Sequence, residues 1–264
     1  MTTYPPELRE YGDVGLPYNN AVLTGWYLKA AAVHTTVPSM IWDSGDLLIA
    51  HEFSADGNIL GTAAPTATGL TFASILNAIG PTGSAGSALT FLATAGSAGQ
   101  SQINSPAASS ATNACGIGCT RIARSTGLGA SAQNVGLAGA GPSNSRATTL
   151  TRTGTNSGVL FVGCDWGATA GMSALILSGS GGAPTSLLMD ANGADYGVYA
   201  LWYPNEGAPG TTTYGFSGTP SNDWAKVAVE VLGTNTAPPT PPTPGAGTEN
   251  KLAMDAMIDK MGTW

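Results

Sequence analysis

The chain consists of short apolar runs separated by clusters of glycine, proline, asparagine and aspartate. In the clearest run, residues 224–232, Val227 and Val229 alternate with the polar Lys226 and Glu230. A period of two is typical of a half-buried strand, and regularly spaced short runs are typical of a sandwich. No long helical pattern lies between the runs, which argues against parallel βαβ architecture. We therefore predict an all-β fold, a jelly-roll-like antiparallel β-sandwich.

Changes in composition, and the stretches rich in proline and glycine, divide the chain into four parts. We expect an extended N-terminal arm (1–20), the sandwich body (21–233), a Pro/Thr/Gly-rich linker (234–248) and a short C-terminal helix (249–264). Within the Gly/Ser-rich segment 79–110, we expect loops around one strand. The strands expected in the body are 46–53, 69–76, 88–93, 147–152, 158–166, 172–178, 196–203 and 224–232.

The N-terminal arm combines prolines and glycines with three evenly spread tyrosines. Such a composition favours an extended segment without a core of its own. We expect Tyr4, Tyr11 and Tyr18 to anchor the arm, either on a neighbouring molecule or on the arm's own body.

The C-terminal segment has the pattern of one amphipathic helix, Glu249 to Met261, whose apolar residues recur at i, i+3, i+4 and i+7. A lone helix of this length is marginal in water, and the proline-rich linker before it is a semi-rigid spacer. We therefore expect the helix to dock on a sister copy or on another protein; the alternative is that it folds back on its own sandwich. The expected docking residues are Leu252, Met254, Met257, Ile258 and Met261.

Charged residues are scarce: they make up 9 % of the chain, against roughly 25 % in typical soluble domains. None occurs between Gly57 and Thr120. The net charge of −7 argues against nucleic-acid binding, which requires a basic surface. No run of eighteen apolar residues is present, so we expect no membrane insertion, and the polar N-terminus does not resemble a secretory signal.

The cysteines and histidines do not form a metal-binding pattern. Cys115, Cys119 and Cys164 are odd in number, which argues against a disulfide framework. The chain has only two histidines, His34 and His51, and neither is near the cysteines in sequence, whereas zinc needs four nitrogen or sulfur ligands. We expect the cysteines to be small buried residues and the chain to hold no metal or cofactor.

Asp190, Asn192 and Asp195 cluster around Gly193 and could supply oxygen ligands to calcium. The same residue types are favoured in any tight turn, and the EF-hand pattern does not fit. We therefore expect a turn.

Carboxylates were considered as catalytic candidates, because sandwich proteins include glycosidases. Glycoside hydrolysis requires two carboxyl groups that flank one bond. Nothing in the sequence brings two of Glu52, Asp165, Glu206 and Glu230 together, and we expect them at solvated strand edges and turns. His51 lies in a strand-like run and is expected to be a core or rim residue. These patterns favour a protein that is not an enzyme.

Aromatic residues are concentrated in 196–203. Alternation places Tyr196 and Trp202 on one strand face and Tyr199 and Tyr203 on the other. One set should be core, and the other could form a platform that packs on a neighbouring subunit or stacks on sugar rings. The candidate glycan platform is Tyr199, Trp202 and Tyr203.

Several strand-and-turn pieces, taken in order, resemble a β-sandwich module of minor tail and other virion proteins of long-tailed actinobacterial phages. The pieces are 45–50, 66–72, 159–166, 199–203, 210–215 and 224–231. The resemblance implies a jelly-roll-like sandwich with a structural or adhesive role, and it supplies no catalytic site.

We therefore expect a minor tail protein, assembled in the host cytoplasm into the virion. It would contact other virion proteins and form a homo-oligomer, for example a trimer. The alternatives are a capsid decoration or head-fibre protein, a carbohydrate-binding module for host adhesion, and a glycan hydrolase.

Overall fold

The computed structural model describes residues 7–8, 36–54, 63–79, 87–105, 115–136, 146–165, 172–192, 196–218 and 224–234. Apart from one 3-10 turn, η2 (Met172–Leu175), their regular structure is antiparallel β-sheet, which confirms the all-β prediction. The C-terminal helix, nearly all of the linker and the tyrosines of the arm lie outside these residues. The strands are β1 (Glu7–Leu8), β2 (Thr36–Trp42), β3 (Leu47–Ser54), β4 (Thr66–Ala67), β5 (Leu70–Thr71), β6 (Ala73–Ile79), β7 (Ser87–Thr94), β8 (Gly99–Asn104), β9 (Cys115–Ala123), β10 (Gly127–Gly136), β11 (Ala147–Arg152), β12 (Gly158–Asp165), β13 (Thr185–Asn192), β14 (Tyr196–Tyr203), β15 (Gly210–Gly215) and β16 (Trp224–Leu232).

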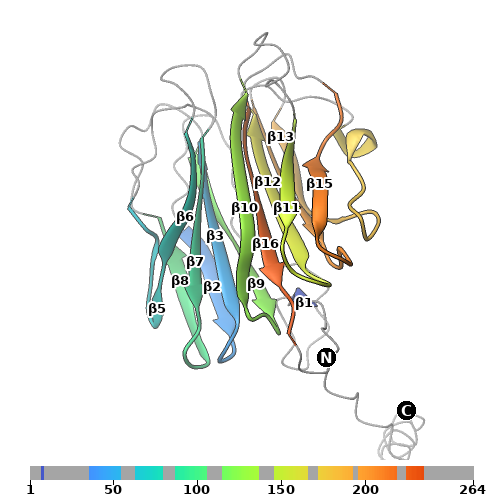
Figure 1. Ribbon diagram of the computed structural model, residues 1–264. Coiled ribbons are helices and arrows are strands. Elements are labelled where there is room, and N and C mark those ends of the chain that lie inside the picture. Colours follow the sequence, from blue (N-terminus) through green and yellow to red (C-terminus); the bar gives the residue numbers. More distant parts are fainter. Residues whose placement is uncertain are drawn as a thin grey trace, which may run out of the picture.

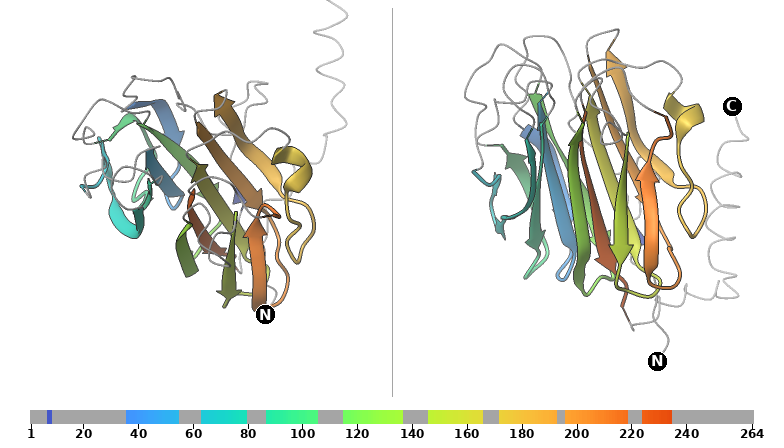
Figure 2. Two further views of the ribbon diagram at one scale, coloured as in Figure 1. Left: turned by 90° about the horizontal axis from the view of Figure 1, so that it is seen from above. Right: turned by 45° about the horizontal axis from the view of Figure 1, so that its top comes forward.

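Two five-stranded sheets stack face to face, and each bears a smaller sheet on its outer face (Figures 1 and 2). Central sheet 1 has the order β1-β9-β3-β7-β6, and central sheet 2 has the order β10-β16-β12-β14-β13. Outer sheet 1 (β2-β8-β4-β5) covers the former, and outer sheet 2 (β11-β15) covers the latter. The described part of the molecule is thus a four-layered sandwich.

Three apolar clusters fill the spaces between these layers. The central core joins residues such as Leu47, Ile49 and Phe53 of sheet 1 to Leu160 and Trp202 of sheet 2. The second cluster lies between central and outer sheet 1, and the third lies between central and outer sheet 2. Both faces of the inner strands β3, β12, β14 and β16 are therefore buried.

The burial of β16 corrects the expectation of a half-buried strand. Val227 and Val231 face the central core, as the alternation predicts, but Trp224, Ala228 and Glu230 on the opposite face are also fully buried. The reason is outer sheet 2, which covers that face. Alternation in sequence distinguishes the two faces of a strand, but it does not show what covers each of them.

Several expected elements differ in the structure. Residues 172–178 form the 3-10 turn η2 and an isolated bridge at Ile176 instead of a strand. The segment 79–110, expected to hold one strand, contains both β7 and β8. Besides β8, the strands that had no counterpart in the expected set are β1, β2, β4, β9, β10, β13 and β15. β10 and β8 are rich in glycine, serine, asparagine and glutamine, so their strand structure depends on pairing with neighbours more than on intrinsic propensity.

The two halves of the chain repeat one topology. In the first half, central strands lie in the order β9-β3-β7-β6 and β2 pairs with β8; in the second half, they lie in the order β16-β12-β14-β13 and β11 pairs with β15. A register shift between Ser74 and Leu76 in β6 has its counterpart between Ser186 and Leu188 in β13. Aligning these shifts matches β9 to β16, with Ala123 corresponding to Leu232. It also matches β1 to the start of β10, because Glu7 pairs with Ala123 and Gly127 pairs with Leu232.

The register places five described connections at one end of the sandwich. They are 43–46, 95–98, 124–126, 153–157 and 204–209, and they lie at the lower end in Figure 1. Strand β1 and the end of β16 lie at this same end. We call it the terminal end of the sandwich.

Candidate docking end of the sandwich

The two described segments nearest the chain ends meet at the β9–β10 connection. On one side of it, Glu7 and Leu8 of β1 pair with Ala123 and Ile122 of β9. The connection therefore lies between β1 and the last strand of the body, because its residues also contact β16.

The contacts with β16 are hydrogen bonds from the connection to its final carbonyl groups. The backbone N–H of Thr126 donates to the carbonyl oxygen of Leu232 at 3.2 Å, and the hydroxyl of Ser125 donates to the same oxygen at 2.8 Å. The hydroxyl of Thr126 donates to the carbonyl oxygen of Gly233 at 3.1 Å. The end of β16 is thus hydrogen-bonded to the β9–β10 connection, which directly follows the residues of β9 that pair with β1.

A buried ion pair stabilises the neighbouring β2–β3 turn. The Arg121 guanidinium of β9 donates through Nε to Asp46 and through an Nη atom to Asp43, the latter at 2.7 Å. Arg121 and Asp46 are buried, whereas Asp43 is exposed. Asp46 also accepts the backbone N–H of Asp43 at 2.9 Å, so one carboxylate closes the turn and neutralises the arginine. A buried charge with these partners avoids the penalty of an unpaired ion.

A small open cavity of about 260 Å³ lies beside this ion pair. It extends from the β2–β3 turn to the β9–β10 connection and the exit of β16. Its lining combines charged and hydroxyl side chains with small apolar residues. The lining residues are Asp43, Ser44, Gly45, Asp46, Ala123, Arg124 and Thr234.

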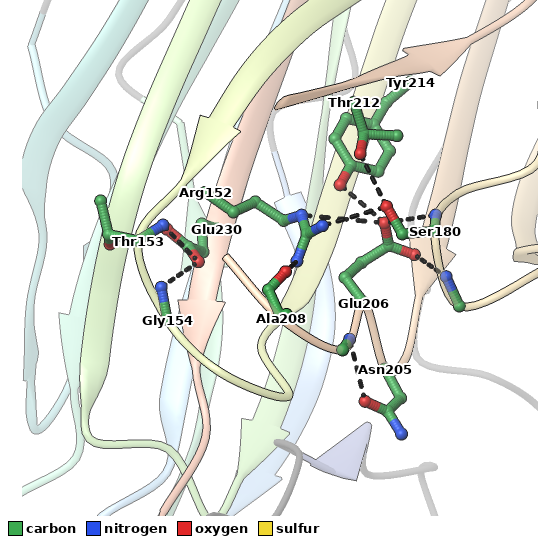
Figure 3. Close-up of polar contacts among 12 residues, drawn as sticks. Arg152, Thr153, Gly154, Ser180, Asn205, Glu206, Ala208, Thr212, Tyr214 and Glu230 are labelled. Atoms are coloured by element: carbon green, nitrogen blue, oxygen red, sulfur yellow. Dashed lines mark hydrogen bonds and ion pairs between the residues drawn. The ribbon is translucent and has the colours of Figure 1, made fainter. Parts of the chain in front are cut away.

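Glu230 of β16 occupies the position in the second half that Arg121 occupies in the first. Figure 3 shows its carboxylate against the β11–β12 turn, where it accepts the backbone N–H groups of Thr153 and Gly154 at 2.9 to 3.1 Å. It also accepts the N–H of Ala130 at 2.8 Å. Burial alone would raise the pKa of Glu230, but these backbone hydrogen bonds outweigh it and lower the pKa below its ordinary value.

Glu206 makes a second carboxylate anchor, at the β14–β15 connection (Figure 3). It accepts the backbone N–H of Ser180 at 2.8 Å and of Gly181 at 3.2 Å, and the Tyr214 hydroxyl at 2.7 Å. The Nε of Arg152 lies 3.9 Å from it, and both side chains are buried. Burial and the hydrogen bond to Glu206 raise the pKa of Tyr214, so this hydroxyl stays protonated as a donor.

These contacts correct the expectation that the candidate acids are solvated. Glu206 and Glu230 are buried and bound by main-chain donors, which fix loops and leave little freedom to move a proton. Glu52 is also buried, and burial raises its pKa to about 7 against a smaller opposing effect of a hydrogen bond with Ser105. The side chain of Asp165 lies outside the described residues. Glu206 and Glu230 share the geometry of structural anchors.

The aromatic platform expected at Tyr199, Trp202 and Tyr203 is wrong. Each of these side chains is at most 2 % exposed. Trp202 belongs to the central core, whereas Tyr199 and Tyr203 lie under outer sheet 2, where Tyr199 stacks on Trp224 with ring centroids 5.5 Å apart. A glycan platform needs an accessible ring face, and in this fold both faces of β14 are covered.

The remaining sequence candidates are placed as follows. His51 is fully buried and its Nδ1 lies 3.1 Å from the Thr90 hydroxyl, which confirms the core assignment; burial lowers its pKa to about 3. Cys119 and Cys164 are free, buried thiols, as expected. Among the described residues, no three potential ligands come together as a metal site. Three sets of candidates lie outside the described residues. They are the side chains of Asp190, Asn192 and Asp195, the three tyrosines of the N-terminal arm, and the docking residues of the C-terminal segment.

Two features of the described sheets were not anticipated from sequence. The first is the buried Arg121. The sequence feature that could have indicated its role is that it is the one charged residue in the strand Cys115–Ala123. Lys226 is the other: it is fully buried, its Nζ has no hydrogen-bond partner within the described ranges, and burial lowers its pKa to about 8. Neither pattern can be recognised before the opposing layer is known.

Comparisons with known proteins return no match. No family model, no curated protein and no solved structure is similar to this chain at a significant level. In the described part, no helix is long and apolar enough to cross a membrane.

We predict that Trp202→Ala destabilises the protein by about 3–5 kcal/mol, because it removes a large side chain from the central core. Urea unfolding followed by tryptophan fluorescence and circular dichroism measures the loss. The control is Thr94→Ala at an exposed position of β7, for which we expect a change within about 0.5 kcal/mol. Equal stability of the two variants would contradict the burial of Trp202.

We predict that Glu230→Gln lowers the free energy of unfolding by at least about 1 kcal/mol at pH 7, because the buried backbone donors lose a charged acceptor. The folded-state pKa is lowered, so the stabilisation is present above the unfolded pKa, near 4.5, and is lost as the pH falls through the folded pKa. Urea titrations from pH 7 to pH 3 should show the difference between wild type and variant shrinking. A difference that stays constant over this range would be inconsistent with an ionised anchor.

Proposed function

We propose that this chain is a structural protein of a phage virion, a minor tail protein that is present in several copies. In this proposal the sandwich is the body that packs in the particle or projects from it. The terminal segments bind neighbouring virion proteins and sister copies, and assembly takes place in the host cytoplasm. That the body is a jelly-roll-like sandwich related to those of virion proteins is part of the same proposal.

The observation that carries the proposal is that β1 and the exit of β16, the described segments nearest to the two chain ends, meet at the terminal end of the sandwich. Strand β1 and the exit of β16 flank one turn, so an arm and a linker that leave this end can reach the same neighbouring surface. The ion pair of Arg121 with Asp46 and the Glu230 anchor rigidify the turns around that exit. A rigid sandwich from whose one end two terminal segments extend suits a subunit that is bound to its neighbours in an assembly.

The composition supports the same proposal. The four-layered sandwich buries both faces of the inner strands of its central sheets, and the scarcity of charge lets further surfaces pack without unpaired ions. A capsid decoration or head-fibre protein would use the same design, and localisation of the protein on particles by electron microscopy distinguishes these positions. The carbohydrate-binding and hydrolytic alternatives have less support, because the expected platform is buried and Glu206 and Glu230 act as anchors of loops.

We predict that deletion of residues 249–264 leaves the sandwich folded and abolishes self-association. The expected readout in light scattering is a fall from a multiple of 26.3 kDa to about the mass of one chain, with an unchanged unfolding transition. Incorporation into particles should be lost in parallel.

Point variants distinguish the loss of a docking contact from the mere shortening of the chain. Met257→Asp places a charge in the apolar stripe and should reproduce the deletion, whereas Lys251→Gln, outside the stripe, should not. Normal assembly of the truncated chain would refute the docking role of the C-terminal segment.

A further inference from the structure

Three buried polar groups lie in one part of the layer between central sheet 2 and outer sheet 2. They are Nζ of Lys226, Nε1 of Trp224 and Oγ1 of Thr148, and none of them has a hydrogen-bond partner within the described ranges. Lys226 and Trp224 are 0 % exposed, and Thr148 is 5 % exposed. Because buried polar groups in folded proteins are nearly always hydrogen-bonded, three such groups in one place indicate a partner that they share.

Two contacts fix how β11 lies over β16. At the start of both strands, the Arg146 guanidinium lies 5.8 Å from the ring centroid of Trp224. At the end of both strands, Glu230 accepts hydrogen bonds from the β11–β12 turn, so the two strands run in the same direction. Thr148 follows Arg146 by two residues and is on the buried face of β11. Lys226 follows Trp224 by two residues on the facing side of β16, so Thr148 and Lys226 lie at one level of the layer.

Apolar packing surrounds these groups. Stacked sheets are about 10 Å apart, a gap that the long side chain of a lysine largely crosses. Toward the terminal end, Leu150 and Ala228 follow on the two strands, and both belong to the third apolar cluster. The Trp224 ring packs against Phe216 and Tyr199, with centroids 6.2 Å and 5.5 Å away. The polar groups therefore lie in an apolar layer, where an unpaired charge is poorly stabilised.

The described charges in this part of the layer are positive. Arg146 is 6 % exposed, and Lys226 is fully buried. Burial lowers the pKa of Lys226 to about 8, so the ammonium form still predominates at pH 7. The described carboxylates of the layer, Glu206 and Glu230, lie at the terminal end and accept hydrogen bonds from main-chain donors there. An apolar side chain of similar size would avoid the cost of burying the ammonium, so its presence indicates a negatively charged partner.

We propose that this part of the layer binds one small inorganic anion, a halide such as chloride, between Nζ of Lys226 and Oγ1 of Thr148. The lysine ammonium and the tryptophan indole are donors only, so the partner that they share is an acceptor. A water molecule accepts hydrogen bonds but leaves the ammonium charge unneutralised, whereas a halide supplies both the acceptor and the negative charge in a single atom. The anion links β11 to β16 and so holds outer sheet 2 on central sheet 2. This inference does not depend on the virion role and is tested without it.

A chloride titration of the full-length chain tests the proposal. A ligand that binds only the folded state raises the folding equilibrium constant about tenfold for each tenfold rise in its concentration above the Kd. Urea unfolding is measured while sodium gluconate is replaced stepwise by sodium chloride, which keeps the ionic strength constant and exchanges a large anion for a small one. The unfolding midpoint of the wild type should rise with the logarithm of the chloride concentration.

Three variants assign the effect to the proposed site. Lys226→Met removes the charge, keeps a side chain of similar length and should abolish the dependence on chloride. Thr148→Val removes one donor but keeps the β-branched shape, and it should weaken the dependence. The matched control is Thr149→Val, at the neighbouring exposed position of β11, which should keep the full dependence. A wild type that does not respond to chloride, or a Lys226→Met variant that responds equally, would overturn the proposal.

A second measurement uses the wild type alone and so does not depend on the folding of a variant. Crystals of the full-length chain soaked in sodium bromide should show an anomalous bromide peak within hydrogen-bonding distance of Nζ of Lys226. A water molecule or a side chain of the protein in that place would show that another group satisfies the ammonium. Either result would contradict the anion site.

Discussion

The structure depends on burying both faces of the inner strands of its two central sheets. A sheet that is covered on one side can carry charge on the other, but here each central sheet lies between its partner and an outer sheet. An ionised group in such strands is stabilised by a counter-ion or main-chain donors, because an unpaired buried charge costs several kcal/mol. Lys226 has no such partner among the described residues, and burial lowers its pKa to about 8. The low content of charged residues is therefore a requirement of the four-layered arrangement.

Five of the charged residues that lie at the terminal end of the sandwich fix turns there: Asp43, Asp46, Arg121, Glu206 and Glu230. Arg121 and Glu230 occupy corresponding positions of the two halves and have opposite charges. One holds the β2–β3 turn through the carboxylates of Asp43 and Asp46, and the other holds the β11–β12 turn through backbone N–H groups. In the two halves of the repeat, the side chain that holds a turn thus occupies the same position on its strand, but it is a cation in one half and an anion in the other. The anchors surround the point where the chain enters and leaves the body, which gives the terminal segments a rigid origin.

Part of the fold could be predicted from local pattern. The runs at 46–53, 88–93, 158–166 and 224–232 are strands in the structure, because apolar and β-branched residues fit the pleated interior of a sheet. The runs that failed depend on context: the 3-10 turn at Met172–Leu175 is apolar without being a strand, and the polar strand Gly99–Asn104 forms because β2 lies beside it. The candidate site was predicted least well, since the same aromatic and acidic residues that could face solvent are covered by layers from distant parts of the chain.

By itself, the sequence determined an all-β body with little charge, apolar alternation in its strands and buried cysteines and histidine, because these follow from residue type and spacing. The tertiary structure alone decided that Trp202, Glu206 and Glu230 are interior, that the halves repeat one topology and that β1 and the exit of β16 flank one turn. Burial on the second face of a strand is set by what packs against it, and the layers that cover β14 and β16 come from elsewhere in the chain.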